Sequence, residues 1–424
     1  MEKHAENEKI RWRNFMALLG DSIFFYPAVA LFEPTTTIPL LIDRLTGSSL
    51  LVGLVGTLRL AGLRLPALPI ANLVKHRERK KPWVLYGCLG RILVGLLGVA
   101  LLVSKHLSDQ LLVGLVLFTH LFFWLGDGIA ALTWTDIVGK CIPEDQRGRF
   151  FGLGQSFGNL AAFGVGFLVK WILDNDALVF PTNYGILFVS AFVLFMVSMG
   201  SFILVKEPPG EVYEEAEPFM QFIRRLPEYL RKDPVFVQIV GKIILIGLGG
   251  LALPFYVLYA KEKLGLPGGV AGYFISAQTL GMVVGGGLWG YLGDTWGHKR
   301  TLGYVGVIQA LAPVAALLAA LAPGYAGRLV IMLVSYVLLG MGQCGWIVGT
   351  NSILETVTPE DRTVYLALSS TLQAPLFLAP FVGGLLVVVG GYTTVFILAA
   401  VLPALAKVRA IPEVETAQPS IGAR

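Results

Sequence analysis

Long apolar runs constrain this chain more than any other feature of its sequence. A helix needs about 20 apolar residues to cross the hydrocarbon core of a bilayer. The sequence holds twelve runs of this kind, bounded by charged or turn-forming residues. Only 14% of the residues are charged, against roughly 25% in a soluble domain. We therefore predict an all-α integral membrane protein with twelve transmembrane helices in two six-helix bundles.

One long polar segment separates the predicted helices into two sets of six. The predicted helices span 14–42, 50–74, 82–103, 110–138, 149–173, 184–205, 234–260, 270–292, 301–322, 328–356, 363–389 and 392–408. The predicted domains are an N-terminal six-helix bundle (1–205), a cytoplasmic linker with a short amphipathic helix near 218–230 (206–233), a C-terminal six-helix bundle (234–408) and a cytoplasmic tail (409–424).

The basic residues predict the orientation of the chain in the membrane. Of its 33 Lys and Arg residues, 23 fall on the side that carries both termini. Such an excess marks the cytoplasmic side, so we expect a multi-pass protein of the cell membrane with both termini in the cytoplasm. The basic residues form no continuous face, so the net charge of +5 does not indicate nucleic acid as a partner.

Several other classes of function are disfavoured. The cysteines, Cys88, Cys141 and Cys344, lie in or beside apolar runs and predict neither a disulfide framework nor a thiolate metal site. The sequence contains no G-x-x-x-x-G-K-[ST] phosphate-binding loop and no recognisable nucleophile–base set. The first apolar run is too long for a cleaved signal peptide. We therefore predict a protein without enzymatic activity, cofactor or metal, in which the first helix is retained.

The two halves carry a sequence repeat. The triplet Pro-Glu-Asp follows the predicted fourth helix at 143–145 and the predicted tenth helix at 359–361, an offset of 216 residues. Because the triplet occupies the same loop of each half, a duplicated six-plus-six architecture explains it better than chance. Two such halves enclose a cavity near the middle of the membrane, as in many secondary transporters.

The loop after the predicted eighth helix carries a motif. Residues 290–300 read Gly-Tyr-Leu-Gly-Asp-Thr-Trp-Gly-His-Lys-Arg. With the twelve spans and the central linker, this loop resembles the signature loop of the major facilitator superfamily, whose members are repeat-built secondary transporters. The loop between the second and third helices, 72–81, contains no glycine and no matching aspartate, so only its positive charge is retained.

The resemblance and the residue types give the motif two interpretations. Gly290 and Gly297 allow tight backbone turns, and Lys299 and Arg300 hold the cytoplasmic side. The resemblance implies that Asp294 acts as a conformational latch against the eleventh helix. The alternative is that Asp294 is a simple helix cap beside a positive anchor.

Ionisable residues inside the predicted spans are candidates for substrate or proton binding, because an unpaired charge in the membrane costs several kcal/mol. The candidates are Asp21, Glu33, Arg59, Arg64, His120, Asp127 and Lys242, with Arg91 as a further embedded charge. Their depths along the helices, at about 1.5 Å per residue, allow three structural pairs. These pairs are Glu33 with Arg59, Asp21 with Arg64, and Arg91 with Asp127.

Three of these residues allow a more specific role. The resemblance places helices 1, 4, 7 and 10 around the cavity. No acid lies deep in a span of the C-terminal half to neutralise Lys242. We therefore predict a contact between Asp21 and Lys242 that closes the cytoplasmic side and breaks in the inward-open state. His120 is either a proton carrier or a core histidine with satisfied hydrogen bonds.

Proline and glycine predict hinges and close helix contacts. Proline removes a backbone hydrogen bond and bends a helix. The predicted hinges are Pro27, Pro34 and Pro39 in helix 1, Gly247, Gly249, Gly250 and Pro254 in helix 7, and Pro375 and Pro380 in helix 11. The small-residue spacings at 281/285 and 286/290 predict close packing of helix 8.

The sequence predicts a secondary active transporter that moves a small organic solute by alternating access, driven by protons, as a monomer in the lipid bilayer. Four embedded cations against three embedded acids favour an anionic or zwitterionic substrate. One alternative is a proton-coupled exporter of amphipathic or cationic compounds. A second alternative is a membrane sensor or scaffold that retains the fold without transporting.

Overall fold

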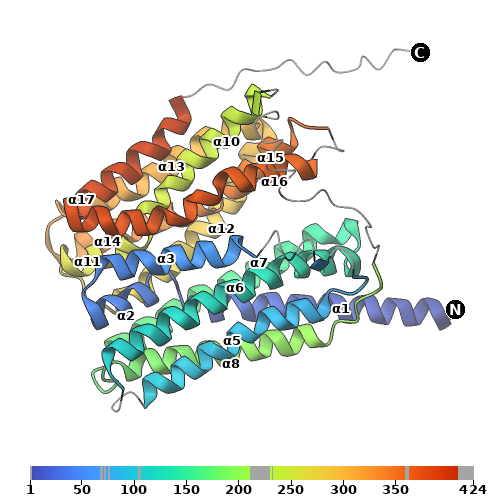
Figure 1. Ribbon diagram of the computed structural model, residues 1–424, viewed down its shortest axis with the longest axis horizontal. Coiled ribbons are helices and arrows are strands. Elements are labelled where there is room, and N and C mark those ends of the chain that lie inside the picture. Colours follow the sequence, from blue (N-terminus) through green and yellow to red (C-terminus); the bar gives the residue numbers. More distant parts are fainter. Residues whose placement is uncertain are drawn as a thin grey trace.

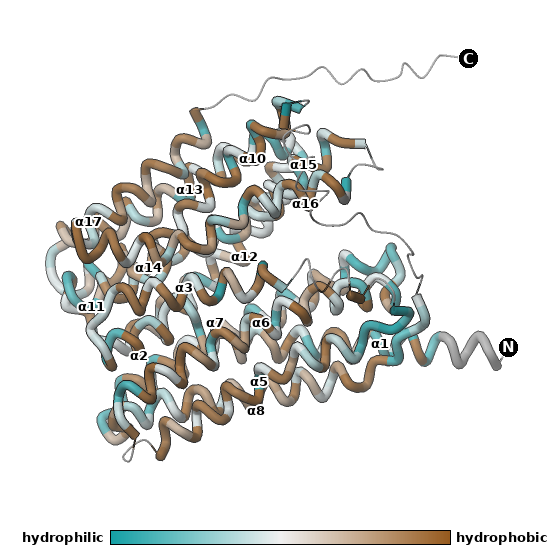
Figure 2. Tube along the Cα trace, viewed as in Figure 1, coloured by the Kyte–Doolittle hydropathy of each residue, from teal (hydrophilic) through white to brown (hydrophobic). Residues whose placement is uncertain are grey.

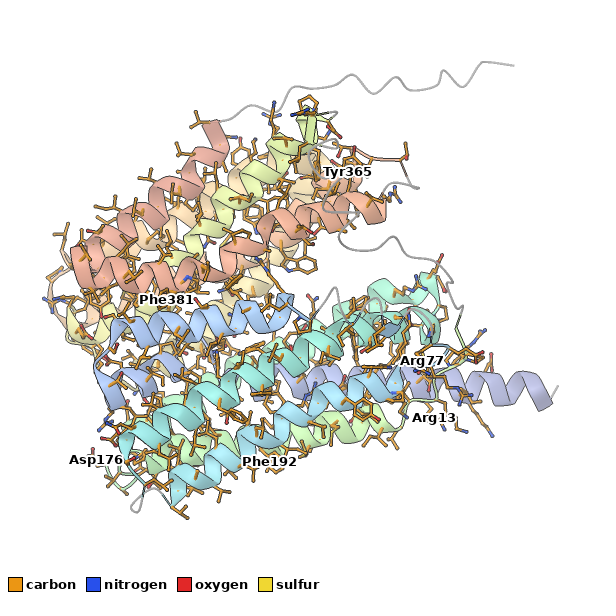
Figure 3. All side chains as sticks on the ribbon, in the orientation of Figure 1. Arg13, Arg77, Asp176, Phe192, Tyr365 and Phe381 are labelled. Carbon is orange, nitrogen blue, oxygen red and sulfur yellow. The ribbon has the colours of Figure 1, made fainter. Side chains whose placement is uncertain are left out.

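Helices that run alongside one another make up the chain (Figure 1). The computed structural model describes residues 2–408, apart from 67–69, 71–72, 75–76, 104–106, 211–229, 232 and 359–361. We call the end of the bundle where α1 (Glu2–Leu31) begins the terminal side, and the opposite end the distal side. Figure 3 places Arg13 and Arg77 toward the terminal side and Asp176 at the distal side.

The N-terminal half consists of long helices and one short one. They are α1, α2 (Thr37–Thr46), α3 (Ser49–Arg64), α5 (Lys81–Leu102), α6 (Asp109–Cys141), α7 (Glu144–Asp174) and α8 (Thr182–Ile203). Serine side chains cap two of them, because Ser48 accepts the Leu51 N–H and Ser108 accepts the Leu111 N–H. These caps satisfy backbone donors that the first turn of a helix leaves free.

The C-terminal half is more often interrupted. Its elements are α10 (Pro234–Gly247), η2 (Leu248–Phe255), α11 (Tyr256–Glu262), α12 (Val270–Trp296), α13 (His298–Ala319), α14 (Gly324–Gln343), α15 (Trp346–Leu354), α16 (Arg362–Gln373), η3 (Ala374–Leu378) and α17 (Ala379–Val408). Gly391 has φ 73° inside α17, and the chain turns back on itself there (Figure 1). This turn lies between the last two predicted spans.

The helix surfaces are those of a membrane protein. Within the described residues, nine helical segments are long and apolar enough to cross a bilayer, and apolar colour dominates the helices while polar colour gathers toward their ends (Figure 2). On α5 the exposed side chains include Tyr86, Leu89, Leu96 and Val99, a pattern that suits lipid and not water. The chain is therefore a multi-pass membrane protein. The number of twelve spans stays a prediction.

Three of the membrane segments are irregular where the sequence predicted hinges. Between α1 and α2 the chain leaves the helix over 32–36, around Pro34. The segment that contains Pro254 is the 3₁₀ helix η2, and Pro375 lies in the 3₁₀ helix η3. Non-helical backbone at membrane depth is tolerated only where protein or water surrounds it. These irregular segments therefore mark the interior of the bundle.

Several sequence predictions need correction or fall outside the described residues. The second predicted helix was expected to run to residue 74, but α3 ends at Arg64 and a turn follows at Leu65 and Pro66. Pro66 has no backbone N–H with which to continue the helix, and helical backbone returns at Ile70, Leu73 and Val74. The amphipathic helix predicted near 218–230 and the second Pro-Glu-Asp triplet lie almost entirely outside the described residues.

The apolar core shows how the two halves meet. One large cluster of buried residues contains side chains of both halves, such as Phe32 of the first and Tyr336 of the second. Toward the terminal side the core divides into two smaller clusters. One, around Phe150, belongs to the N-terminal half, and the other, around Trp289, belongs to the C-terminal half. The halves therefore share a core in the middle and at the distal side, and separate toward the terminal side.

Glycines set the distance between α12 and α14. A Cβ atom at Gly281 would lie 2.0 Å from the Val337 carbonyl oxygen, and one at Gly285 would lie 2.7 Å from the Met341 Cα. A Cβ at Gly286 or Gly290 would meet no described atom within 4 Å. The predicted close packing at 281/285 is therefore confirmed, and that at 286/290 is wrong because those residues lie on another side of the helix.

We predict that Gly281→Ala lowers the thermal stability of the purified protein, whereas Gly286→Ala leaves it unchanged or raises it. Overpacking costs about 1–3 kcal/mol, while alanine is favoured over glycine in an open helical position by up to about 1 kcal/mol. Thermal unfolding of both variants in the same detergent measures the difference. Equal melting temperatures for the two variants would contradict the packing described here.

Candidate functional site

A buried cluster around Asp21 joins four helices of the N-terminal half. The Ser198 hydroxyl of α8 donates to Asp21 Oδ1 over 2.5 Å, and the Trp134 indole N–H of α6 donates to Asp21 Oδ2 over 2.9 Å. Arg91 of α5 lies with Nη1 3.8 Å from Asp21 Oδ1 and donates to the Ser198 hydroxyl over 3.0 Å. Asp21 therefore accepts two hydrogen bonds and forms an ion pair with Arg91.

Arg91 is enclosed by aromatic rings as well as by the carboxylate. Its Cζ lies 5.1 Å from the centroid of Phe25 and 5.6 Å from that of Phe195. These faces favour a cation that has left water. The predicted pairs of Asp21 with Arg64 and of Arg91 with Asp127 are thus wrong as direct contacts, because Arg91 projects from α5 onto Asp21.

Asp127 of α6 faces a cavity beside this cluster. The cavity has a volume of about 170 Å³, and its walls include Asp21, Phe25, Tyr26, Asp127 and Trp134. Asp127 is partly exposed and forms no hydrogen bond with any residue in the described part of the chain. It nevertheless lies close enough to interact electrostatically with Arg91 and with Arg59 of α3.

The second polar cluster lies at the break in the first membrane segment. The backbone N–H and the hydroxyl of Thr35 contact Glu33 Oε1 at 3.2 and 2.8 Å. The same hydroxyl lies 3.2 Å from Gln278 Oε1 on α12, and Gln278 in turn bonds Gln343 on α14 over 3.1 Å. Glu33 is thereby connected to the C-terminal half. We call Glu33, Thr35, Arg59, Gln278 and Gln343 the Glu33 cluster.

Buried polar atoms without partners gather around this break. Within the described residues, the atoms without a hydrogen bond include Thr36 Oγ1, Thr37 Oγ1, Arg59 Nε, His120 Nδ1, Trp124 Nε1, Tyr336 OH and Gln343 Nε2. The Arg59 guanidinium stacks over Trp124 at 5.1 Å, and Glu33 interacts electrostatically with Arg59 and Tyr336. Leaving a buried donor unsatisfied costs about 1–3 kcal/mol. These atoms are therefore available to water or to a bound solute.

The charges of the two clusters form one alternating series. Asp21 pairs with Arg91, and electrostatic interactions link Arg91 to Asp127, Asp127 to Arg59, and Arg59 to Glu33. Asp127 also interacts with the like charge of Asp21. The predicted proximity of Glu33 and Arg59 is therefore confirmed as an electrostatic interaction, without a direct ion pair. Each internal member of the series has an opposite charge on either side, which offsets the cost of removing charge from water.

Polar contacts between the two halves lie in the middle and toward the distal side of the described chain. Lys261 Nζ of α11 is 2.7 Å from Asp43 Oδ2 of α2, and the Ser276 hydroxyl of α12 donates to the Phe163 carbonyl over 2.7 Å. The Phe381 N–H of α17 donates to the Thr57 hydroxyl of α3 over 3.2 Å, and Figure 3 shows Phe381 above α3. The distal side is therefore closed.

Arg64, His120 and Lys242 take separate positions. Arg64 is exposed and donates to the Gln373 carbonyl over 2.9 Å. His120 is fully buried, and its Nε2 lies 3.0 Å from the Val55 carbonyl, while its Nδ1 has no described partner. Both interpretations of His120 therefore stay predictions. Lys242 is 5% exposed and lies close to Lys407. It does not contact Asp21 in this structure, so the predicted contact between them stays a prediction.

The signature loop is arranged differently from the expectation. Gly297 has φ 79° and makes the predicted turn between α12 and α13, but Gly290 lies inside α12 and makes no turn. Asp294 is exposed and forms no hydrogen bond with a described residue. The loop directly before the eleventh helix, 359–361, lies outside the described residues, and the latch role of Asp294 stays a prediction. Lys299 and Arg300 begin α13 on the terminal side.

The sequence analysis missed the residue that does connect this loop to another helix. His298 Nδ1 lies 2.5 Å from Glu355 Oε1, and its Nε2 lies 3.0 Å from the Asn351 amide nitrogen. Both partners belong to the terminal end of α15 and the residue that follows it. The sequence does contain one signal for this contact, because His298 directly follows Gly297, the glycine of the turn.

The corresponding loop of the N-terminal half is held by Glu207. This carboxylate accepts the backbone N–H groups of Lys80 and Lys81 at 2.8–2.9 Å and lies 3.0 Å from Lys140 Nζ. Lys80 and Lys140 both contact Asp136, at 2.7 and 2.8 Å. Glu207 therefore caps the start of α5 in the half that lacks the motif.

Comparison with known proteins agrees with this architecture. Residues 240–423 match the sequence profile of the Major Facilitator Superfamily. The C-terminal part of the chain is therefore similar to this superfamily. Several solved transporters share the fold over more than nine tenths of the chain.

Three solved structures illustrate the shared fold. The nucleoside transporter NupG has a TM-score of 0.69 at 12% identity, covering 92% of this chain and 98% of its own. A D-xylose–proton symporter has a TM-score of 0.69 at 15% sequence identity, and the match covers 93% of this chain and 95% of the symporter. A bacterial homologue of the iron transporter ferroportin, in its inward-facing state, has a TM-score of 0.68 at 15% sequence identity. The match covers 94% of this chain and 97% of the homologue. A comparison with curated protein sequences gives no match.

We predict that Arg91→Gln strongly destabilises the protein, because it leaves the Asp21 carboxylate buried without its cation. Removing one partner of a buried pair costs about 3–5 kcal/mol, whereas Arg64→Gln removes an exposed side chain and should cost much less. The double variant Asp21→Asn with Arg91→Gln should be more stable than Arg91→Gln alone. Thermal unfolding of the three variants measures this, and a double variant less stable than Arg91→Gln would refute the pairing.

Proposed function

We propose that the chain is a secondary active transporter that moves a small organic solute across the cell membrane by alternating access, as a monomer. The observation that carries this proposal is the Glu33 cluster. It connects the two halves at a break in a membrane segment, and buried donors without partners surround it. A solute that satisfies these donors would bind both halves at once, as alternating access requires.

The chemistry of the cluster supports an anionic or zwitterionic substrate. Arg59 Nε and Trp124 Nε1 are buried donors without a described acceptor, and a substrate carboxylate accepts from both kinds of group. In a zwitterion, Glu33 would take the ammonium group. The similar folds of a nucleoside transporter and a D-xylose–proton symporter support a small polar solute.

The orientation follows from the basic residues. We infer that the terminal side, which carries most of the Lys and Arg residues, faces the cytoplasm. The closed distal side is then the outer side, and the divided core opens toward the cytoplasm. The structure would thus represent an inward-facing state of the transport cycle.

Proton coupling would act through Asp127. The alternating series contains three carboxylates and two guanidinium groups, so one carboxylate lacks a compensating cation. Asp21 accepts from Ser198 and Trp134, and Glu33 accepts from Thr35, whereas Asp127 has no described donor and faces a cavity. A proton on Asp127 would neutralise the series, and its release would restore the net negative charge.

A second candidate is a proton-coupled exporter of amphipathic or cationic compounds. The cavity beside Asp127 favours it, because two carboxylates and the rings of Phe25, Tyr26 and Trp134 are suited to a small organic cation. Arg91 also lines this cavity and opposes such a ligand. A non-transporting sensor or scaffold is the remaining alternative.

Counterflow in proteoliposomes, after a thermal-shift screen for ligands, tests the proposal. We expect carboxylate-bearing solutes to stabilise the protein and to exchange across the membrane. Arg59→Gln should weaken their binding about 10- to 100-fold, since hydrogen bonds to charged groups contribute about 1.5–3 kcal/mol. Arg147→Gln, which removes a surface cation, is the control. Stabilisation only by lipophilic cations would favour the exporter, and absence of all exchange would favour the scaffold.

We predict that Asp127→Asn separates exchange from proton-driven accumulation. The amide keeps the shape of the side chain but cannot gain or lose a proton, so counterflow should persist while a pH gradient no longer drives uptake. Asp174→Asn, which removes a carboxylate at the distal end of α7, should leave both unchanged. Solute-dependent proton flux measured with an internal pH dye distinguishes the variants, and undiminished flux in Asp127→Asn would refute the assignment.

A further inference from the structure

Lys242 lies where three helices of the C-terminal half meet near the terminal side. A Cβ atom at Gly306 of α13 would lie 2.5 Å from the Pro403 carbonyl of α17 and 3.4 Å from Ile246 of α10. Lys242 lies one turn from Ile246 on α10, and Lys407 lies one turn from Pro403 on α17. Helices α10, α13 and α17 therefore pack closely at this point. Lys242 and Lys407 lie near each other on the terminal side of the contact.

Aromatic and basic side chains surround this edge. Lys407 Nζ lies 3.4 Å from the centroid of the Tyr304 ring, and Tyr304 packs against Trp296 at 5.5 Å. Arg300 Cζ lies 5.9 Å from the Trp296 ring. Tryptophan and tyrosine are enriched where the bilayer meets water. We call Lys242, Arg300, Tyr304 and Lys407 the basic junction.

The basic junction carries positive charge that the described residues do not neutralise. Lys242 is buried, while Arg300 and Lys407 are exposed. None of these cations forms an ion pair with a carboxylate in the described part of the chain, and Lys242 interacts electrostatically with the like charge of Lys407. Two neighbouring lysines without a counter-charge repel each other, so an anion would stabilise this arrangement.

An apolar stripe leads from the junction along the outside of α17. Ile397, Val401, Leu405 and Val408 are all exposed, and their spacing of three or four residues places them on one side of the helix. Val408 directly follows Lys407. A ligand that uses both features must combine an anionic group with a long apolar chain.

We propose that the basic junction binds the headgroup phosphate of an anionic phospholipid, with an acyl chain along the exposed stripe of α17. Basic pockets between membrane helices bind anionic headgroups in this way. The buried Lys242 gives the site a cation that is partly removed from water and less screened by salt than a surface charge. The site is separate from the Glu33 cluster, which belongs to the centre of the molecule.

Binding of phosphatidylglycerol and phosphatidylcholine with identical acyl chains to the full-length protein in detergent tests the proposal. We expect phosphatidylglycerol to be preferred. The double variant Lys242→Gln with Lys407→Gln should bind it about 25-fold more weakly, because each lysine contributes about fivefold. Lys9→Gln with Lys206→Gln removes two exposed lysines of the N-terminal half and should change binding less than about twofold. Native mass spectrometry measures the bound lipid.

Several results would overturn the proposal. They are equal binding of the two lipids, an equal loss in both double variants, and stabilisation by inorganic phosphate alone equal to that by phosphatidylglycerol. The last result would assign the site to free anions. Should the Lys242 variant fail to fold, Lys407→Gln alone changes an exposed residue and should still show about a fivefold loss. Replacing both lysines by arginine should retain the preference for phosphatidylglycerol.

Discussion

Five ionisable side chains share the membrane-embedded N-terminal half because their charges alternate. In lipid a lone charge must find a counter-charge or water, and here Arg91 and Arg59 each lie between two carboxylates. The helix packing fits this requirement, since Asp21 of α1 meets Arg91 of α5 beside α8, which packs against both helices. The series ends at Glu33, where the first membrane segment is broken. The charged side chains of the N-terminal half thus extend to Glu33, which lies at the interface with the C-terminal half.

The breaks in the helices and the polar interface depend on each other. A proline such as Pro34 frees backbone groups that lipid cannot satisfy, so the break must face the protein interior. At this break the Thr35 backbone N–H donates to the Glu33 carboxylate, and the Thr35 hydroxyl contacts Gln278. The same residues therefore bend the helix, position the carboxylate and connect the halves. A straight helix in this place could not have brought Glu33 to the second half in this manner.

The sequence predicted the helices and their bends, because apolar length and proline act locally along the chain. It did not predict the pairing of Asp21 with Arg91, because depth along a helix fixes only one of the coordinates that a contact requires. The two glycine spacings show the same limit. Gly281 and Gly286 differ by five residues, about 140° around a helix, so only one of them faces α14. Ser198 and Trp134 carry no sequence signal that marks them as partners of an aspartate.

The apolar cluster shared by the two halves has a thermodynamic consequence for the cycle. A conformation that opens the distal side must separate side chains such as Phe32 and Tyr336 and expose part of their surface to water. Hydration of apolar surface increases heat capacity, whereas closing the divided core toward the terminal side would bury apolar surface and lower it. The difference between these two areas would set any heat-capacity difference between the two conformations. Temperature would then act on their relative populations through the packing of the core.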